Sequence, residues 1–299
     1  MLFVVAALTG PAVAEAAEPV GAEVGCASPG TGIRVALAEP TAGAAIPAAT
    51  LAPVALVVPP VAETAVQADT DAKAESEGGV SYGAEIDMNS RYLWRGLALS
   101  HGAVLQPSVH LSAHGATITA WNNTFLGSEP DLTNRFGELD LIAEYQESLG
   151  KLTITPSFIA YIYPQGSPTG ELGAGVGYDL SVLKVSTHQF VDVIDNAGGY
   201  YADVGLSRAQ PLGAKITLDG ATVLGWCSGR FTRFYLAHDM RGLGLGAASA
   251  DLGVKFAATA AFSARLHGTY SRMLDTGVRA EVGPDAQIFL AGVSAVIEL

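Results

Sequence analysis

The C-terminal two-thirds of the chain is divided into short segments in which apolar and polar side chains alternate, and this alternation restricts the possible folds more than any other feature. In residues 259–271, for example, Leu266 falls on an apolar face and Arg265 on a polar one. A period of two residues is that of a β-strand, whose successive side chains point to opposite faces. The sequence therefore predicts strands that are apolar on one face and polar on the other.

Twelve segments of this kind follow one another between residue 80 and the C-terminus. They cover residues 80–93, 103–113, 116–124, 136–147, 150–162, 170–180, 182–192, 200–209, 213–225, 246–256, 259–271 and 286–298. Their length of about ten residues is that of a strand that crosses a membrane. The sequence has no run of about twenty apolar residues that could cross as a helix, although 49% of its residues are hydrophobic. Two classes remain, a large soluble β protein and a membrane β-barrel.

The connections between these segments alternate strictly between short and long. The short connections lie near residues 114–115, 149–150, 181, 210–212 and 257–258. The long connections are residues 94–102, 125–135, 163–169, 193–199, 226–245 and 272–285. An up-and-down barrel in an outer membrane has tight turns at its periplasmic rim and longer loops at its outer rim. A soluble sandwich with Greek-key connections has no reason to show this alternation, so the pattern favours the membrane barrel.

The direction of the two faces follows from the number of strands. Twelve strands closed into one ring enclose more volume than inward apolar side chains can fill, whereas a polar interior can hold water. We therefore expect an all-β fold, a 12-stranded antiparallel up-and-down transmembrane β-barrel with a disordered N-terminal segment. Apolar residues alternate along the last segment as far as Leu299, and we expect this strand to contact the barrel-assembly machinery.

The N-terminal part of the chain has a different composition. Residues 1–17 have the apolar centre and the small residues near the end that are typical of a secretory signal peptide. Residues 18–79 are rich in Ala, Pro, Val and Glu and contain no aromatic residue, so we expect a disordered linker without a packed core. We assign the barrel to residues 80–299 and expect it in the outer membrane of a Gram-negative bacterium.

Charge and cysteine content exclude several other classes of protein. Sixteen Lys and Arg against 29 Asp and Glu give a net charge of −13, which disfavours a nucleic-acid partner. Cys26 lies in the Ala- and Pro-rich segment and Cys227 in the part with alternating residues, so the two form no disulfide framework or metal motif. His110 and His114 are four residues apart, which in a strand is a separation of about 13 Å. We expect neither a cofactor nor a bound metal.

One segment resembles a known family. The sequence DMNSRYLWRGLALSHGAVLQPSVHLS, followed by ITAWNNTFLG, ELDLIAEY and IAYIYP, resembles the bacterial TorF-like porin family. Its members have a first strand that ends in an aromatic-x-aromatic-Arg-Gly turn, here Tyr92, Trp94, Arg95 and Gly96. The resemblance covers roughly residues 80–165 and implies an outer-membrane channel or transport protein, with no assigned substrate.

The same turn can be interpreted from its residues alone. Tyr92 and Trp94 can anchor the end of the strand at the membrane interface, and Gly96 permits an unusual φ at the start of the loop. These four residues are candidate site residues, and we favour a structural anchor over a ligand site.

The polar faces place more acids than bases toward the expected interior. The candidate pore-lining residues are Glu85, Asp87, Arg91, Glu138, Asp140, Glu144, Asp179, Lys184, Asp203, Lys215, Asp219, Asp251, Lys255 and Arg265. A surplus of acids in a pore favours cations or neutral solutes. The sequence therefore predicts a channel for passive diffusion of small hydrophilic solutes, with a weak preference for cations. In the alternative, these charges pair and close the pore, which leaves a non-conducting structural or adhesion barrel.

A lipid-modifying barrel enzyme is a third possibility. Ser108 and His110 share one face of their segment, as do Ser263 and His267. Same-face neighbours in a strand are about 6.5–7 Å apart, so this spacing does not bring a nucleophile and a base into contact. We therefore do not expect an enzyme or catalytic residues.

Membrane components are the remaining expected partners. The long connection 226–245 carries Arg230, Arg233 and Arg241, which can fold inward or contact the phosphates of lipopolysaccharide. We expect outer-membrane lipids and lipopolysaccharide around the barrel.

Overall fold

The computed structural model describes residues 79–127, 135–164, 166–236 and 242–299. The predicted signal peptide (1–17) and all but the last residue of the predicted linker (18–79) lie outside these residues. Of the helices in the described residues, none has both the length and the apolarity needed to cross a membrane.

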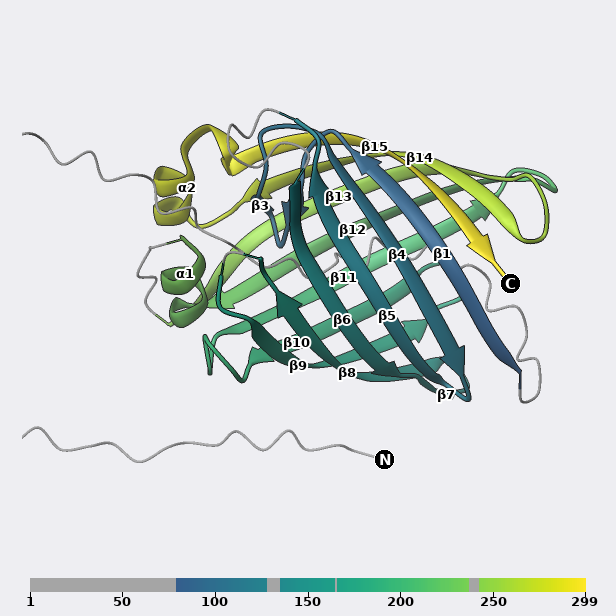
Figure 1. Cartoon of the computed structure of the whole chain (residues 1–299), viewed down its shortest axis with the longest axis horizontal. Coiled ribbons are helices and arrows are strands. Elements are labelled where there is room, and N and C mark those ends of the chain that lie inside the picture. Colours follow the sequence, from purple (N-terminus) through teal and green to yellow (C-terminus); the bar gives the residue numbers. More distant parts are fainter. Residues whose placement is uncertain (1–78, 128–134, 165, 237–241) are drawn as a thin grey trace, which may run out of the picture. The chain divides into compact units, whose positions relative to one another are not determined.

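Twelve long strands in the described part of the chain form one antiparallel sheet that closes on itself (Figure 1). They are β1 (Val80–Asn89), β4 (Val104–Ala113), β5 (Ala116–Phe125), β6 (Arg135–Tyr145), β8 (Leu152–Ile162), β9 (Thr169–Asp179), β10 (Lys184–Asp192), β11 (Tyr200–Pro211), β12 (Ile216–Ser228), β13 (Leu243–Ala257), β14 (Phe262–Met273) and β15 (Gln287–Glu298). Each strand pairs with the next long strand along the chain, and β1 pairs with β15. The short strand β7 (Glu147–Leu149) extends the edge of β6 and pairs with β8. The predicted 12-stranded up-and-down barrel is confirmed.

The two faces of the sheet point as the sequence predicts. Outward side chains are apolar and exposed, for example Leu266 at 66% and Phe289 at 69%. Inward side chains of the same strands are polar and covered, for example Thr269 and Ser271 on β14. An apolar outer surface of this extent is stable only against hydrocarbon. The outward apolar side chains therefore indicate a barrel that spans a membrane.

The long connections carry all the shorter elements of the described residues other than β7. The connection from β1 to β4 contains the two-residue strands β2 (Leu93–Trp94) and β3 (Leu97–Ala98). Helix α1 (Gly229–Leu236) follows β12. Helix α2 (Thr276–Val282) and the 3-10 helix η1 (Gly283–Ala286) lie between β14 and β15. Figure 1 places α1 and α2 at the end of the barrel where the long connections gather.

Most strand boundaries differ from the prediction by one to three residues, and two of the differences move candidate residues off the strands. The first strand was expected to continue to residue 93, but β1 ends at Asn89, and the chain then turns into the β2–β3 hairpin. The ninth strand was expected to begin at residue 213, but β12 begins at Ile216. Arg91 and Lys215 therefore lie in connections rather than on the barrel wall. In both cases the alternation continues by chance through residues that form a turn.

Candidate functional site: the barrel interior and the β2–β3 hairpin

The β2–β3 hairpin, residues 92–100, has a tight turn at Arg95 and Gly96. Both residues have positive φ, 46° and 86°, and Leu93 and Trp94 pair with Ala98 and Leu97 on either side. Positive φ at both central residues is typical of a two-residue type I′ hairpin turn. An arginine in this conformation is strained, so the contacts of its side chain hold the turn.

The tip of the hairpin reaches the inner faces of strands far from its own. A Cβ built on Gly96 would lie 2.2 Å from the Cβ of Ala247 on β13 and 3.1 Å from the Sδ of Met273 on β14. Trp94 is fully buried and Leu97 is 3% exposed. The hairpin therefore lies inside the barrel, and its turn requires glycine both for φ and for space.

Arg95 forms a buried bidentate ion pair with Glu171 on β9. Its Nη1 donates to Oε1 at 2.9 Å and its Nη2 to Oε2 at 2.7 Å, while the hydroxyl of Tyr161 donates to Oε2 at 2.9 Å. The two charged side chains are only 2% and 1% exposed. Burial lowers the pKa of Arg95, but the Glu171 carboxylate outweighs it and raises that pKa above its usual value. The guanidinium thus stays charged.

Four aromatic rings surround the same guanidinium. The Cζ of Arg95 lies 4.2 Å from the ring centroid of Tyr201, 4.8 Å from Trp94, 4.9 Å from Phe190 and 5.4 Å from Phe231. Such cation–π contacts are strongest when the charge is removed from water. They come from the hairpin itself, from β10, from β11 and from α1, so one arginine joins four parts of the chain.

Helix α1 packs over the hairpin. Trp94 stacks on Phe231 with ring centroids 5.4 Å apart and meets the edge of Tyr235 at 5.0 Å. All three side chains belong to one buried apolar cluster that also includes Val278 of α2. The interior at the long-connection end, which we call the long-loop half, is therefore packed like a protein core.

Tyr92 holds the base of the hairpin to the barrel wall. Its hydroxyl donates to Oε2 of Glu138 at 3.1 Å, and its backbone N–H donates to the hydroxyl of Ser100 at 2.8 Å. Burial raises the pKa of Tyr92 well above its usual value, with the neighbouring carboxylates adding to the effect, so the phenol remains a donor. The expectation that Tyr92 and Trp94 anchor at the membrane interface is wrong, because they are 3% and 0% exposed inside the barrel.

A row of hydrogen-bonded polar side chains crosses the wall of the long-loop half. Asn89 on β1 donates to Gln106 on β4 at 3.0 Å, and Gln106 donates to Asn123 on β5 at 3.1 Å. Glu138 and Asp140 follow on β6, where Asn123 and Glu138 face each other in register. All five side chains are buried.

The opposite end of the interior, the short-turn half, has a different cluster of charges. Arg265 on β14 donates from Nε to Asp219 on β12 at 2.8 Å and also bonds Asp251 on β13. His267 lies 3.4 Å from Asp251 and 3.5 Å from Asp87 on β1. Thus the barrel brings together four predicted interior residues, one base and three acids, along with His267.

The other predicted residues are more scattered. His188 Nδ1 lies 2.7 Å from the carboxylate of Asp203, across β10 and β11. Arg91 pairs with Asp285 at 2.8 Å in the long connections. Lys215 donates to the backbone carbonyl of Ala258 in a short turn. Glu85, Lys184 and Lys255 are half-buried on inward faces, whereas Glu144 and Asp179 are exposed near the short turns.

The serine and histidine pairs considered for catalysis do not meet in the described residues. His110 contacts Glu298 at 3.2 Å, and His267 contacts Asp87 and Asp251. Ser112 bonds Thr117 at 2.8 Å. Among the hydrogen bonds of the described segments, none joins Ser108 to His110 or Ser263 to His267.

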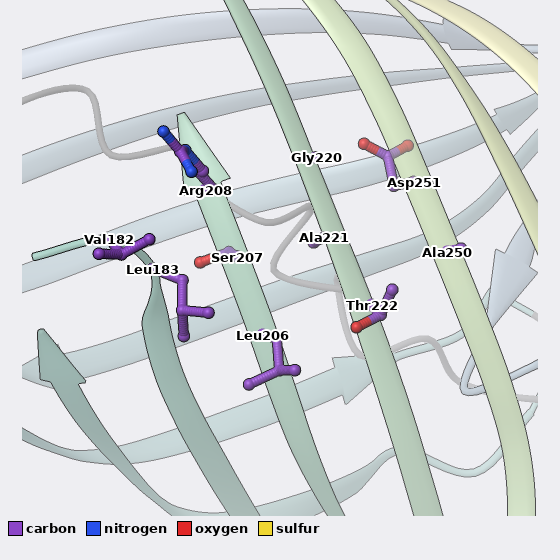
Figure 2. A pocket seen from close by; sticks show the side chains of 10 residues that line it. All are labelled: Val182, Leu183, Leu206, Ser207, Arg208, Gly220, Ala221, Thr222, Ala250 and Asp251. Carbon is purple, nitrogen blue, oxygen red and sulfur yellow. The ribbon is translucent and has the colours of Figure 1, made fainter. Parts of the chain in front are cut away.

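A shallow depression lies on the wall where β11, β12 and β13 run side by side (Figure 2). Leu206, Thr222 and Ala250 line it on successive strands, next to Val182 in a short turn. Its two charged residues are Arg208, which bonds Gln210 at 2.8 Å, and Asp251, which bonds Arg265. Both are engaged elsewhere, so the depression presents no convergent set of polar groups.

Comparison with known proteins extends the fold assignment. No protein-family model matches the chain, and no curated protein matches it in sequence. The solved NanC porin superposes with a TM-score of 0.51 at 12% identity, over 72% of this chain and all of that one. The KdgM porin has a TM-score of 0.44 at 8% identity, over 73% and 98% of the two chains. An outer membrane channel from Pseudomonas putida F1 has a TM-score of 0.44 at 11% identity, over 74% and 96%. At 12% identity the likeness to the NanC porin concerns the fold alone, which is that of a porin-like barrel.

Proposed function

We propose that the protein is a channel of the bacterial outer membrane for passive diffusion of small hydrophilic solutes. The observation that carries this proposal is a closed ring of twelve strands whose outer face is apolar and whose inner face is polar and charged. Such a wall suits water and dissolved solutes inside and lipid outside. The sequence resemblance to TorF-like porins supports the same function and location.

The charge of the interior supports a weak preference for cations. In the short-turn half, Asp87, Asp219 and Asp251 face one arginine and one histidine. The acids outnumber the permanent positive charge, and this surplus attracts small cations into a narrow pore. We assign pore lining to the predicted residues on the inward faces of the strands.

The β2–β3 hairpin limits conduction in this proposal. It occupies the long-loop half with buried aromatic side chains, so solutes pass only where the hairpin leaves space or when it moves. Small conductance is expected, rather than that of a wide, water-filled porin.

Planar-bilayer recording of the refolded full chain tests the proposal. We expect discrete conductance steps, and under a tenfold KCl gradient a reversal potential of the sign that favours K⁺. Complete absence of steps, with correctly folded protein in the bilayer, would favour the alternative of a non-conducting structural or adhesion barrel. A reversal potential that favours Cl⁻ would contradict the cation preference and leave the channel function intact.

The proposed partners follow from the location. The outer face contacts outer-membrane lipids, and β15 is the strand that we assign to recognition by the barrel-assembly machinery. Arg230 on α1 is exposed at the long-connection end, where it can contact phosphates of lipopolysaccharide, whereas Arg241 lies outside the described residues.

A further inference from the structure

Glu138 and Asp140 form a pair of buried carboxylates on β6. They are two residues apart on the inward face, so their side chains point the same way, and they are 3% and 0% exposed. Buried carboxylates are costly unless a positive charge or a full set of donors compensates them.

That compensation is missing among the side chains that the structure describes. Glu138 accepts one hydrogen bond, from Tyr92, through Oε2. Within the described segments, its Oε1 and both carboxylate oxygens of Asp140 accept none. The ion pairs of these segments join neither residue to a cationic side chain, and Arg95 is bound to Glu171.

A separate side chain points to the same place. Tyr163, just after β8, is 7% exposed, and its hydroxyl has no hydrogen-bond partner in the described part of the chain. In the antiparallel β6–β8 register Leu139 pairs with Ile162, so the next residues, Glu138 and Tyr163, lie opposite each other on the same face of the sheet. Four oxygens of the described residues thus lie together without a hydrogen bond from any group outside this cluster, namely one from Glu138, two from Asp140 and one from Tyr163.

The local charge balance indicates the kind of ligand. If all are counted as ionised, three carboxylates, Glu138, Asp140 and Glu171, share this region with one guanidinium, Arg95, which gives a formal surplus of two negative charges. One shared proton would neutralise only one of them, whereas one divalent cation neutralises both. A set made only of oxygen atoms suits a hard cation, and Ca²⁺ accepts irregular geometry and completes its shell with water.

We propose that Glu138, Asp140 and Tyr163 bind a Ca²⁺-type divalent cation in the long-loop half of the barrel. Tyr92 bonds Glu138, so the cation stabilises the carboxylate that holds the base of the β2–β3 hairpin. The site does not depend on whether the barrel conducts, and its test uses binding rather than conductance.

Terbium luminescence of the full-length refolded protein in detergent gives a direct readout. Trp121 faces Asp140 in the β5–β6 register, so an ion bound there receives excitation energy from a neighbouring indole. We expect saturable luminescence that Ca²⁺ displaces and K⁺ does not. Asp140→Asn should weaken terbium binding at least tenfold, and Asp203→Asn, which changes an acid paired with His188, should leave it within twofold.

Two further measurements keep the proposal open to refutation if Asp140→Asn fails to fold. Tyr163→Phe removes one ligand oxygen without changing charge and should weaken binding about threefold to tenfold. Ca²⁺ should also raise the unfolding temperature of the unmodified protein by several degrees relative to EDTA. No saturable binding, equal binding by Asp140→Asn, or an unfolding temperature of the unmodified protein that is the same in Ca²⁺ and in EDTA would each overturn the proposal. The last result would indicate that the carboxyl groups share a proton.

Discussion

The two halves of the barrel interior are built on the same twelve strands but from different side chains. In the long-loop half, Trp94 and the Arg95–Glu171 pair are buried among aromatic rings. In the short-turn half, the charged residues Arg265 and Asp251 keep 13% and 17% of their side-chain surface exposed. The difference arises because a long connection folds into one end of the ring, whereas the turns at the other end are too short to fold inside it. The predictions below test this contrast.

Removal of the hairpin should have the largest effect. Replacement of residues 92–99 by a short Gly-Ser connection removes Trp94 and Arg95 from the long-loop half. We expect single-channel conductance in planar bilayers to rise severalfold, because the short-turn half then opens directly to the outer rim. A matched replacement in the loop 194–198 should leave conductance near its original value, and equal conductance of both variants would contradict a constricting role for the hairpin.

Loss of the Glu171 carboxylate, the partner of Arg95, should have the next largest effect, which is on the free energy of unfolding. Glu171→Gln leaves the Arg95 guanidinium buried without its counter-charge, and such changes cost about 3–5 kcal/mol. Asp285→Asn breaks the Arg91 pair, whose side chains are 33% and 26% exposed, and should cost about 0–1 kcal/mol. Urea unfolding in detergent micelles, followed by tryptophan fluorescence, measures both. Similar losses from the two variants would mean that the long-loop half is open to water.

Two glycines give a smaller and more local comparison. Gly96→Ala combines a φ of +86° with a Cβ that would overlap Ala247, so we expect a loss of about 2–3 kcal/mol. Gly150→Ala has a φ of +67° but nothing within 4 Å of the new Cβ, so strain alone should cost about 1 kcal/mol. Urea unfolding in detergent micelles measures the loss of unfolding free energy in both variants. Equal costs would show that the hairpin tip is not packed against the wall.

The sequence predicted the strands well because the signal for them is local. All twelve segments are strands, with boundaries mostly within three residues, and the alternation of β14 sorts Leu266 outward and Thr269 inward as expected. Short turns such as residues 114 and 115, both with positive φ, also have a local signature in His-Gly. The exception is residues 90–93, where alternation continues although the strand has ended.

The long-loop half could not be predicted in the same way. The β2 and β3 strands have two residues each, too few to show a period on either side of the Arg95-Gly96 turn. The motif residues Tyr92, Trp94, Arg95 and Gly96 were identified as candidates, but their inward direction was not. Glu171, the partner of Arg95, was not among the candidates. Its signal in the sequence was a single acidic residue near the start of a Gly-rich segment.

The sequence alone therefore determined the ring of strands and the direction of their faces, because period-two alternation and turn residues act over a few neighbouring positions. Only the tertiary structure decided what fills the ring. Arg95 meets Glu171 across 76 residues of sequence, and Glu138, Asp140 and Tyr163 gather through the register of two strands and the end of one of them. Such contacts depend on closure of the sheet, which sets which inward side chains face each other.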